Sequence, residues 1–488
     1  MLDVRQERTE QDCPQDKSLP WLDNRRLPVT PARAASRLYG LLAPALMITV
    51  SAAAWLWPDM PSSARLVLWV YGIALVAWAA TSVNAGFVGL AAVSTLLATD
   101  TVPQQWVADV LATKVVWLIF GAFILGEALI RTGLANRLTA SVLCSAGSAR
   151  GLAWRLTGVL VLFAFLVPTT TGRAALVLPL LRSLPQHSGD GLKRCLGLLI
   201  PCIVLVSTPV TLTGAAAHLL ANEMLSNTGH APIGFAGWLL LAGPFGLMAS
   251  LVTAWIVLKR HLPNVEESLP TAEPGPQRWS RAEWFTLTVL GGMFALWMTA
   301  GANPLGFTIV MLLGAVVLVA PAIGVLDWKE VMKAAPWDVV IFAGSAVWLG
   351  RALVESGTSS WLVGQFVSVT GLGSHSGPFV VILSLSVIGV TAHLYLTSHT
   401  ARVAALLPPL LALASEVGWN PTIVVLVTVI GIDYCLTFPV SSKAILLYEL
   451  DQTQAADLFR LSLLLMPIYL LLMIIFYFMW WQPMGLVL

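Results

Sequence analysis

The chain has 488 residues, of which 57% are hydrophobic and only 11% are charged. Soluble domains carry roughly 25% charged residues, so a water-soluble fold is excluded because it could not bury this much apolar surface. The formal net charge of +2 shows no basic excess that would indicate a nucleic-acid partner. A mean hydropathy of +0.81 instead indicates an integral membrane protein.

Residues 1–36 form a polar segment in which Arg25, Arg26 and Arg33 come shortly before the first apolar stretch. No small-residue cleavage pattern that would mark a signal peptide follows it. Basic residues collect on the cytoplasmic side of inner-membrane proteins. We therefore expect a retained cytoplasmic tail at 1–36 and a second cytoplasmic segment, the polar linker at 259–282.

Most of the remaining chain consists of apolar stretches close to the ~20 residues that a helix needs to cross a bilayer. They are apolar on every face rather than alternating, so we expect an all-α, polytopic membrane protein with about 11 transmembrane helices. The predicted spans are 39–57, 64–83, 85–99, 112–131, 193–213, 235–258, 284–300, 305–324, 336–355, 420–440 and 461–481. Trp480 and Trp481 come near a span end, where aromatic belts form.

Two further apolar stretches, 152–185 and 377–416, are each interrupted by a polar knot rich in Thr or Pro. We expect a re-entrant hairpin at each, followed by a broken helix at 193–225 and at 420–450. The hairpins and broken helices divide the chain into an N-terminal repeat, 37–258, and a C-terminal repeat, 283–488.

An internal repeat supports this division. Residues of the first half recur in the second at offsets of 224 to 230: Gly126 and Gly133 as Gly350 and Gly357, Thr171 and Arg173 as Thr400 and Arg402, and Pro209 as Pro439. Six predicted spans separate the cytoplasmic tail from the cytoplasmic linker, and five more place the C-terminus in the periplasm. The two repeats therefore enter the membrane from opposite sides, which is the architecture of secondary transporters.

Each predicted hairpin tip is rich in hydroxyl groups and begins a helix, whose free N–H groups attract an anion. The candidate substrate-binding residues at the tips are Thr169, Thr170, Thr171 and Arg173 in the first repeat, and Ser398, His399, Thr400 and Arg402 in the second. The alternative for the hydroxyl residues is helix capping alone.

The broken helices supply further candidates, because unwound backbone survives in a membrane where it lines protein or a water-filled cavity. These candidates are Thr213 and Gly214 in the first repeat, and Pro439, Ser441, Ser442 and Lys443 in the second. An arginine at membrane depth costs about 2.5 to 3.5 kcal/mol, so it has a partner or a function. We expect Arg173 and Arg402 to face carboxylate or sulfate oxygens. The alternative is that they pair with a carboxylate such as Asp433, which could also pair with Lys443, or that they point toward water.

The tips resemble those of the divalent anion/sodium symporter family, a branch of the ion transporter superfamily. The family carries a Ser-Asn-Thr tip about ten residues before a proline in each repeat. Thr169-Thr170-Thr171 before Pro179 and Ser398-His399-Thr400 before Pro408 occupy that pattern. The resemblance, which covers roughly residues 40–481, implies an elevator motion and a homodimer in the inner membrane.

The chain departs from this family at the positions whose asparagines surround sodium ions. Thr170, His399 and His218 stand there, and Lys443 falls near the fourth such position. We therefore expect a transporter of a small anion, a dicarboxylate, sulfate or related oxyanion, without sodium coupling. It would run as an exchanger, or with protons carried by His218, His399 or Asp433.

Two alternatives remain open: a proton-coupled antiporter or efflux protein of the same superfamily, and a membrane sensor or scaffold that does not transport. The sequence has no nucleotide-binding loop, catalytic triad or metal-ligand cluster. We expect no enzyme activity, no resident metal and no cofactor other than Na⁺ or H⁺ as coupling ion. The expected partners are the substrate anion, the lipid bilayer and a second copy of the chain.

Overall fold

The computed structural model describes residues 60–81, 83–135, 148–167, 190–262, 278–299, 305–370, 376–394, 398–436 and 453–488, together with positions 47, 49, 52, 55, 137, 138, 141, 170, 172–174, 176, 177 and 396. Within these residues it contains helices and no strand. The predicted all-helical membrane fold is confirmed.

Six helices of the described chain are long and apolar enough to cross a membrane, or seven if one bent pair is counted as a single span. They are Gln104–Arg131, Ala149–Leu166, Gly191–Val210, Trp337–Glu355, His399–Val417 and Asp457–Trp481. Other apolar helices, such as Phe307–Val319 and Pro421–Asp433, have 10–17 residues. Several predicted spans correspond to these shorter helices, and the predicted span 39–57 lies almost wholly outside the described residues.

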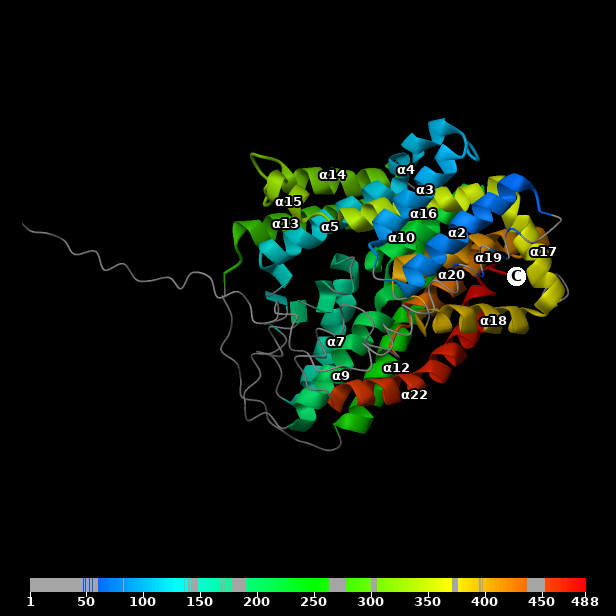
Figure 1. Ribbon diagram of the computed structural model, residues 1–488. Helices are drawn as coiled ribbons and strands as arrows, with labels where there is room; N and C mark the ends of the chain where they lie inside the picture. The colour runs from blue at the N-terminus through cyan, green and yellow to red at the C-terminus, as the bar shows by residue number, and fades with distance from the viewer. Residues whose placement is uncertain are drawn as a thin grey trace, which may run out of the picture.

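The first group of helices occupies the upper part of Figure 1 and combines the early elements of both halves. It contains α2 (Ser62–Ala80), α3 (Ala85–Ala98), α4 (Asp109–Ala112), α5 (Lys114–Arg131), α13 (Arg281–Met298), α14 (Phe307–Val319), α15 (Trp328–Ala334) and α16 (Trp337–Glu355). Their packing is reciprocal: α3 lies on α16, and α14 lies on α5. A Cβ atom on Gly89 of α3 would lie 2.7 Å from Ser345 Cβ, and one on Gly121 of α5 would lie 2.6 Å from Met311 Cγ. Glycine thus permits both close contacts.

Two arginines tie the halves together in the same reciprocal way. Arg131 at the end of α5 binds Glu127, one turn earlier, at 2.5 Å, and also Glu330 on α15. Arg351 on α16 binds Glu355, one turn later, at 2.7 Å, and Asp109 on α4 at 3.0 Å. Each arginine therefore reaches the short helix that precedes the equivalent long helix of the other half.

The second group of helices lies lower in Figure 1. Its members are α7 (Ala149–Leu166), α9 (Asp190–Val206), α12 (Gly243–His261), α18 (Pro378–Thr391) and α22 (Thr453–Phe476). Helix α7 packs on α9 and α12, and α18 packs on α22 and on α20 (Pro421–Asp433). Helices α10 (Ala216–Asn227) and α19 (His399–Val417) contact each other, α16 of the first group and α20, so they lie between the two groups. Helix α17 (Thr358–Thr370) packs on α19.

The predicted span at 235–258 is bent into two helices. Helix α11 (Phe235–Leu241) and α12 meet at an angle of 44° around Ala242, just before Pro244. Trp480 and Trp481 donate their ring N–H groups to the carbonyls of Leu240 and Leu241, at 3.0 and 2.8 Å. Trp481 is completely buried, so it stabilises this bend and does not belong to an aromatic belt.

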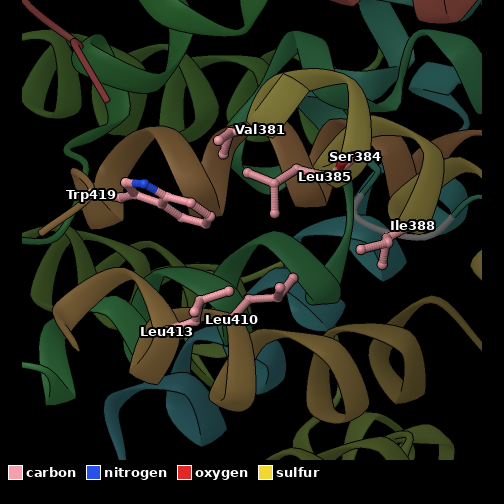
Figure 2. Close-up of a pocket in the computed structure, with 7 residues that line it drawn as sticks. All are labelled: Val381, Ser384, Leu385, Ile388, Leu410, Leu413 and Trp419. Carbon is pink, nitrogen blue, oxygen red and sulfur yellow. The ribbon is translucent and has the colours of Figure 1, made fainter. Parts of the chain in front are cut away.

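A small apolar hollow separates α18 from α19. Figure 2 shows its lining, which consists of Val381, Ser384, Leu385, Ile388, Leu410, Leu413 and Trp419. None of the predicted site residues lines this hollow. It therefore contributes nothing to the candidate site, which lies where α9 and α20 end.

Candidate functional site

Helix α9 ends at Val206 inside the protein, and the stretch that follows is completely buried. It forms two short 3₁₀ turns, η3 (Thr208–Val210) and η4 (Leu212–Gly214), before α10 begins. The turns press against each other so closely that a Cβ atom on Gly214 would lie 2.2 Å from the Thr208 carbonyl oxygen. The break thus leaves hydroxyl and carbonyl oxygens concentrated at the end of a helix.

Arg173, from the segment after α7, meets these oxygens. Its side chain is fully buried. The guanidinium donates to Ser207 Oγ at 3.3 Å, to Thr208 Oγ1 at 2.8 Å and to the Gly214 carbonyl at 3.0 Å. A helix end carries about half a negative charge, so the guanidinium stabilises it by charge as well as by hydrogen bonds.

Arg402 makes the equivalent arrangement in the other half. It lies on the first turn of α19, which Ser398 begins by accepting a hydrogen bond from the Ala401 N–H at 3.5 Å. Fully buried, Arg402 donates to the carbonyls of Leu396 and Ile432 at 2.9 and 2.6 Å. It also reaches Cys435 Sγ at 2.9 Å, just beyond the end of α20.

Asp433, the last residue of α20, lies between two histidines. Its Oδ2 is 2.8 Å from Nε2 of His218 on α10, and its Oδ1 is 3.5 Å from Nδ1 of His399 on α19. Asp433 and His218 are completely buried, and the His218 ring stacks on Trp238 with centroids 4.8 Å apart. The cluster therefore joins a helix of the first half to two helices of the second.

The hydrogen-bond partners of His218 determine how many hydrogens the His218–Asp433 pair holds. Nδ1 of His218 lies 3.1 Å from the Thr211 carbonyl, which can only accept, so Nδ1 carries a hydrogen. Nε2 faces a carboxylate oxygen, so a hydrogen must lie between these two atoms as well. The pair is either an imidazolium with a carboxylate or a neutral imidazole with a carboxylic acid, and its net charge is zero in both cases.

The other predicted site residues are placed as follows. Thr213 is buried at the break, 3.1 Å from the Thr211 hydroxyl. Thr170 is half-buried, and Ser398 is exposed with its hydroxyl 2.9 Å from that of the half-buried Thr400. Thr169, Thr171, Pro439, Ser441, Ser442 and Lys443 lie outside the described residues.

Several residues of the cluster were not among the predicted candidates. Ser207, Thr208 and Thr211 were recognised only as part of a broken helix, although their hydroxyl and carbonyl groups were a usable signal. No sequence signal indicated that Arg402 would reach Cys435. Neither arginine makes a described salt bridge with Asp433, which binds the histidines instead.

The oxygens at the end of α9 are already hydrogen-bonded to an arginine. Sodium sites in secondary transporters use half-helix ends and unwound carbonyls, but Arg173 already donates to Ser207, Thr208 and Gly214 here. At the end of α20, Arg402 bonds two carbonyls and a thiol, and sulfur is a poor ligand for a hard cation. Among the described residues, no group of three His, Cys, Asp or Glu side chains could hold a metal ion either.

Membrane helices broken at buried charged groups, in two halves that exchange contacts reciprocally, are typical of secondary transporters. The chain belongs to the family described as the sodium:sulfate symporter transmembrane region, which matches residues 36–487. Members of this family are transporters and not enzymes.

Two relatives with assigned activities are antiporters. The L-tartrate/succinate antiporter of Escherichia coli K12 is 26% identical over 411 residues, which cover 77% of this chain and 80% of that protein. The citrate/succinate antiporter of the same organism is 24% identical over 391 residues, 76% of this chain and 79% of that protein. A membrane protein of Cupriavidus necator is 29% identical over 343 residues, 67% of this chain and 65% of that protein.

Solved structures share the fold at low sequence identity. The YdaH transporter of Alcanivorax borkumensis superimposes with a TM-score of 0.55 at 14% identity, covering 86% of this chain and 99% of that chain. MtrF of Neisseria gonorrhoeae gives a TM-score of 0.52 at 13% identity, covering 89% and 98%. At these identities the likeness shows a common membrane transporter fold and nothing about substrate.

Proposed function

We propose that the chain exchanges small dicarboxylate anions across the bacterial inner membrane without sodium. The observation that carries this proposal is the pair of fully buried arginines, Arg173 and Arg402, at the ends of α9 and α20. The relatives named as succinate antiporters favour a dicarboxylate over sulfate and exchange over uptake.

Charge balance supports a dianion. The His218–Asp433 pair with its hydrogen is neutral. Arg173 and Arg402 then give the described cluster a charge of about +2, which a dicarboxylate dianion would neutralise. Buried charges are costly unless they are compensated, so a substrate of opposite charge is favoured over a neutral or cationic one.

The direct anion contacts remain a prediction. Both arginines use several N–H groups inside the protein, so they attract the anion mainly through charge. The hydroxyl groups and free N–H groups of the tips around Thr170 and Ser398 are the proposed contact points. We propose that the two hairpins and the two broken helices, which include α7, α9, α10, α18, α19 and α20, move together as an elevator against a scaffold formed by the remaining spans, within a homodimer.

A liposome experiment tests this function. Purified protein would be reconstituted into vesicles preloaded with succinate, and entry of labelled succinate, tartrate, citrate or sulfate would be measured in sodium and in choline. We expect dicarboxylate entry that needs an internal dicarboxylate and is unchanged by choline. Accumulation driven by a sodium gradient into vesicles without internal anion would contradict the proposal.

Proton-coupled antiport or efflux is a second candidate, favoured by the hydrogen shared between His218 and Asp433 and by His399 at 3.5 Å from the same carboxylate. It predicts that an imposed proton gradient drives net anion movement in vesicles that lack a counter-anion. Entry of no anion under any gradient would favour the sensor or scaffold instead.

A further inference from the structure

Helix α19 contains two adjacent prolines, Pro408 and Pro409, in its interior. Proline has no N–H group, so it leaves the carbonyl four residues earlier without its helical partner. The two carbonyls concerned belong to Ala404 and Ala405, and both residues are buried. Because a buried carbonyl without a donor is costly, these two require a hydrogen bond from outside α19.

Tyr71 of α2 supplies this hydrogen bond. Its hydroxyl donates to the Ala404 carbonyl at 2.6 Å and lies 3.2 Å from the Ala405 carbonyl. A hydroxyl has one hydrogen, so the two carbonyls share it. Tyr71 is buried, and it lies on a helix that packs on α3 and α16 of the first group as well as on α19. One side chain of the first group therefore completes the backbone of α19.

The contact crosses the boundary of the proposed elevator motion. Helix α19 belongs to a predicted hairpin, whereas α2 belongs to the proposed scaffold. The start of α19 holds the candidate site residues Ser398, His399, Thr400 and Arg402. Sliding of α19 along α2 would carry its two carbonyls away from the Tyr71 hydroxyl, and the prolines provide no N–H group that could replace it. The position of these site residues is thus linked to one hydrogen bond.

We propose that Tyr71 is a latch of the transport cycle: its hydroxyl supplies the hydrogen bond that Pro408 and Pro409 remove, and it thereby favours the conformation in which α19 lies against α2. This inference rests on the elevator motion of the proposed function. Leaving this conformation breaks the bond, and returning restores it. In the first repeat Leu180 follows Pro179, so the paired prolines occur in the second repeat alone. The latch therefore makes the two ends of the cycle unequal in free energy.

Replacement of the prolines distinguishes a latch from a simple packing contact. In Pro408→Ala/Pro409→Ala, α19 regains two N–H groups that can bond the Ala404 and Ala405 carbonyls within the helix. The Tyr71 hydroxyl is then no longer needed. Tyr71→Phe should therefore shift the conformational equilibrium when the prolines are present and have little effect when they are replaced. A hydroxyl that only stabilises the fold would act equally in both backgrounds.

A spectroscopic experiment measures this equilibrium without transport. Spin labels would be attached to Thr99→Cys, at the end of α3, and to Glu416→Cys, near the end of α19, in a background without native cysteines. Both positions are exposed. The distance distribution in liposomes gives the population whose distance matches this structure. Tyr71→Phe should lower that population relative to the other by roughly two- to tenfold, the change that corresponds to one hydrogen bond.

Tyr477→Phe is the matched control. Tyr477 is also completely buried, and its hydroxyl accepts a hydrogen bond from the Leu488 N–H at 3.4 Å, near the C-terminus. Removal of this hydroxyl should leave the population ratio unchanged. Succinate exchange by the same variants would be measured separately. A shifted ratio in Tyr71→Phe without any dicarboxylate exchange would reject the proposed substrate and support the latch.

Two results would overturn the inference: an unchanged ratio in Tyr71→Phe, or an equal change with and without the prolines. Distances that respond to succinate but not to loss of the Tyr71 hydroxyl would reject the latch and retain the elevator. A distance that never changes, in any variant or with any anion, would reject the motion and the latch together. If Tyr71→Phe folds only when the prolines are replaced, the hydroxyl supplies the missing donor, whereas failure to fold in both backgrounds would contradict this role.

Discussion

Nε2 of His218 on α10 lies 2.8 Å from Oδ2 of Asp433 at the end of α20, with both side chains completely buried. The contact joins the two halves of the chain across 215 residues of sequence. Because Nδ1 of His218 faces the Thr211 carbonyl, the pair must hold a hydrogen between its facing atoms. Any change that removes one partner therefore leaves a buried polar group unsatisfied.

The first prediction concerns the stability that this pair provides. Asp433→Ala should lower the free energy of unfolding by about 3 to 5 kcal/mol, the range for breaking a buried pair from one side. Asp433→Asn should cost less, because its amide N–H can donate to a neutral His218. Asp109→Ala, in an exposed pair with Arg351, should cost no more than about 1 kcal/mol. Denaturant unfolding in detergent measures all three, and equal losses for Ala and Asn at position 433 would contradict the assignment.

The second prediction concerns the buried break after α9. Gly214→Ala places a methyl group 2.2 Å from the Thr208 carbonyl oxygen, which belongs to the backbone and cannot move aside. We expect a loss of at least about 1 to 3 kcal/mol. Gly158→Ala, in the exposed face of α7 where a Cβ would meet nothing within 4 Å, should be neutral or stabilising by about 0.5 to 1 kcal/mol. Gly214→Ala should therefore unfold at a lower denaturant concentration than wild type, whereas Gly158→Ala should unfold at the same or a higher concentration. Equal shifts of the two unfolding curves would contradict this expectation.

The third prediction concerns pH and a group outside the membrane spans. Glu283, before the predicted span 284–300, accepts two hydrogen bonds from Arg137, at 2.7 and 3.0 Å, and one from the Ser280 N–H at 2.6 Å. The bond from the Arg137 guanidinium is the main reason that the pKa of Glu283 falls from 4.5 to about 2. A pKa lowered by folding contributes stability that is present above about pH 4.5 and lost as the pH falls toward 2.

The matching experiment compares wild type with Glu283→Gln. Their difference in Tm should be constant from neutral pH down to about 5 and should shrink below about 4.5, where the carboxylate of the unfolded chain becomes protonated. A difference that grows as the pH falls would show that the sign is wrong.

The fourth prediction concerns orientation. In a background without native cysteines, Pro274→Cys in the linker should react with an impermeant thiol reagent only from the cytoplasmic side. Met484→Cys, near the C-terminus, should react only from the periplasmic side. Reaction of both from one side would mean that the two halves are not inverted.

The sequence predicted the positions of the polar breaks but not the direction in which their side chains point. Hydropathy and the internal repeat placed Arg173 and Arg402 at equivalent tips, because both signals can be read from the sequence around each residue without knowledge of the tertiary structure. Their hydrogen-bond partners, apart from Leu396, are 30 to 41 residues away, at or just beyond the end of the next helix. Only the tertiary placement of α9 and α20 shows that the guanidiniums bind carbonyls and hydroxyls.

The central histidines illustrate the same limit. His218 and His399 were selected as coupling candidates, and so was Asp433, but nothing local indicated that one carboxylate would lie between both rings. The bend at Ala242 is a different case. Gly243 and Pro244 were a local signal for it, but the stretch 235–258 is apolar throughout and was interpreted as one straight span. Pro at the first positions of a helix commonly marks a new helix.

The separation between His218 and Asp433 also has a consequence for biosynthesis. Arg173 finds its partners within 41 residues, so they can meet as soon as α9 and α10 are made. His218 must wait for a residue 215 positions later, a delay of about 10 to 40 s at ordinary rates of translation. During that interval a half-made protein holds a polar ring with no carboxylate inside the membrane. Quality-control proteases that remove stalled chains would find this site incomplete until the second half has been inserted.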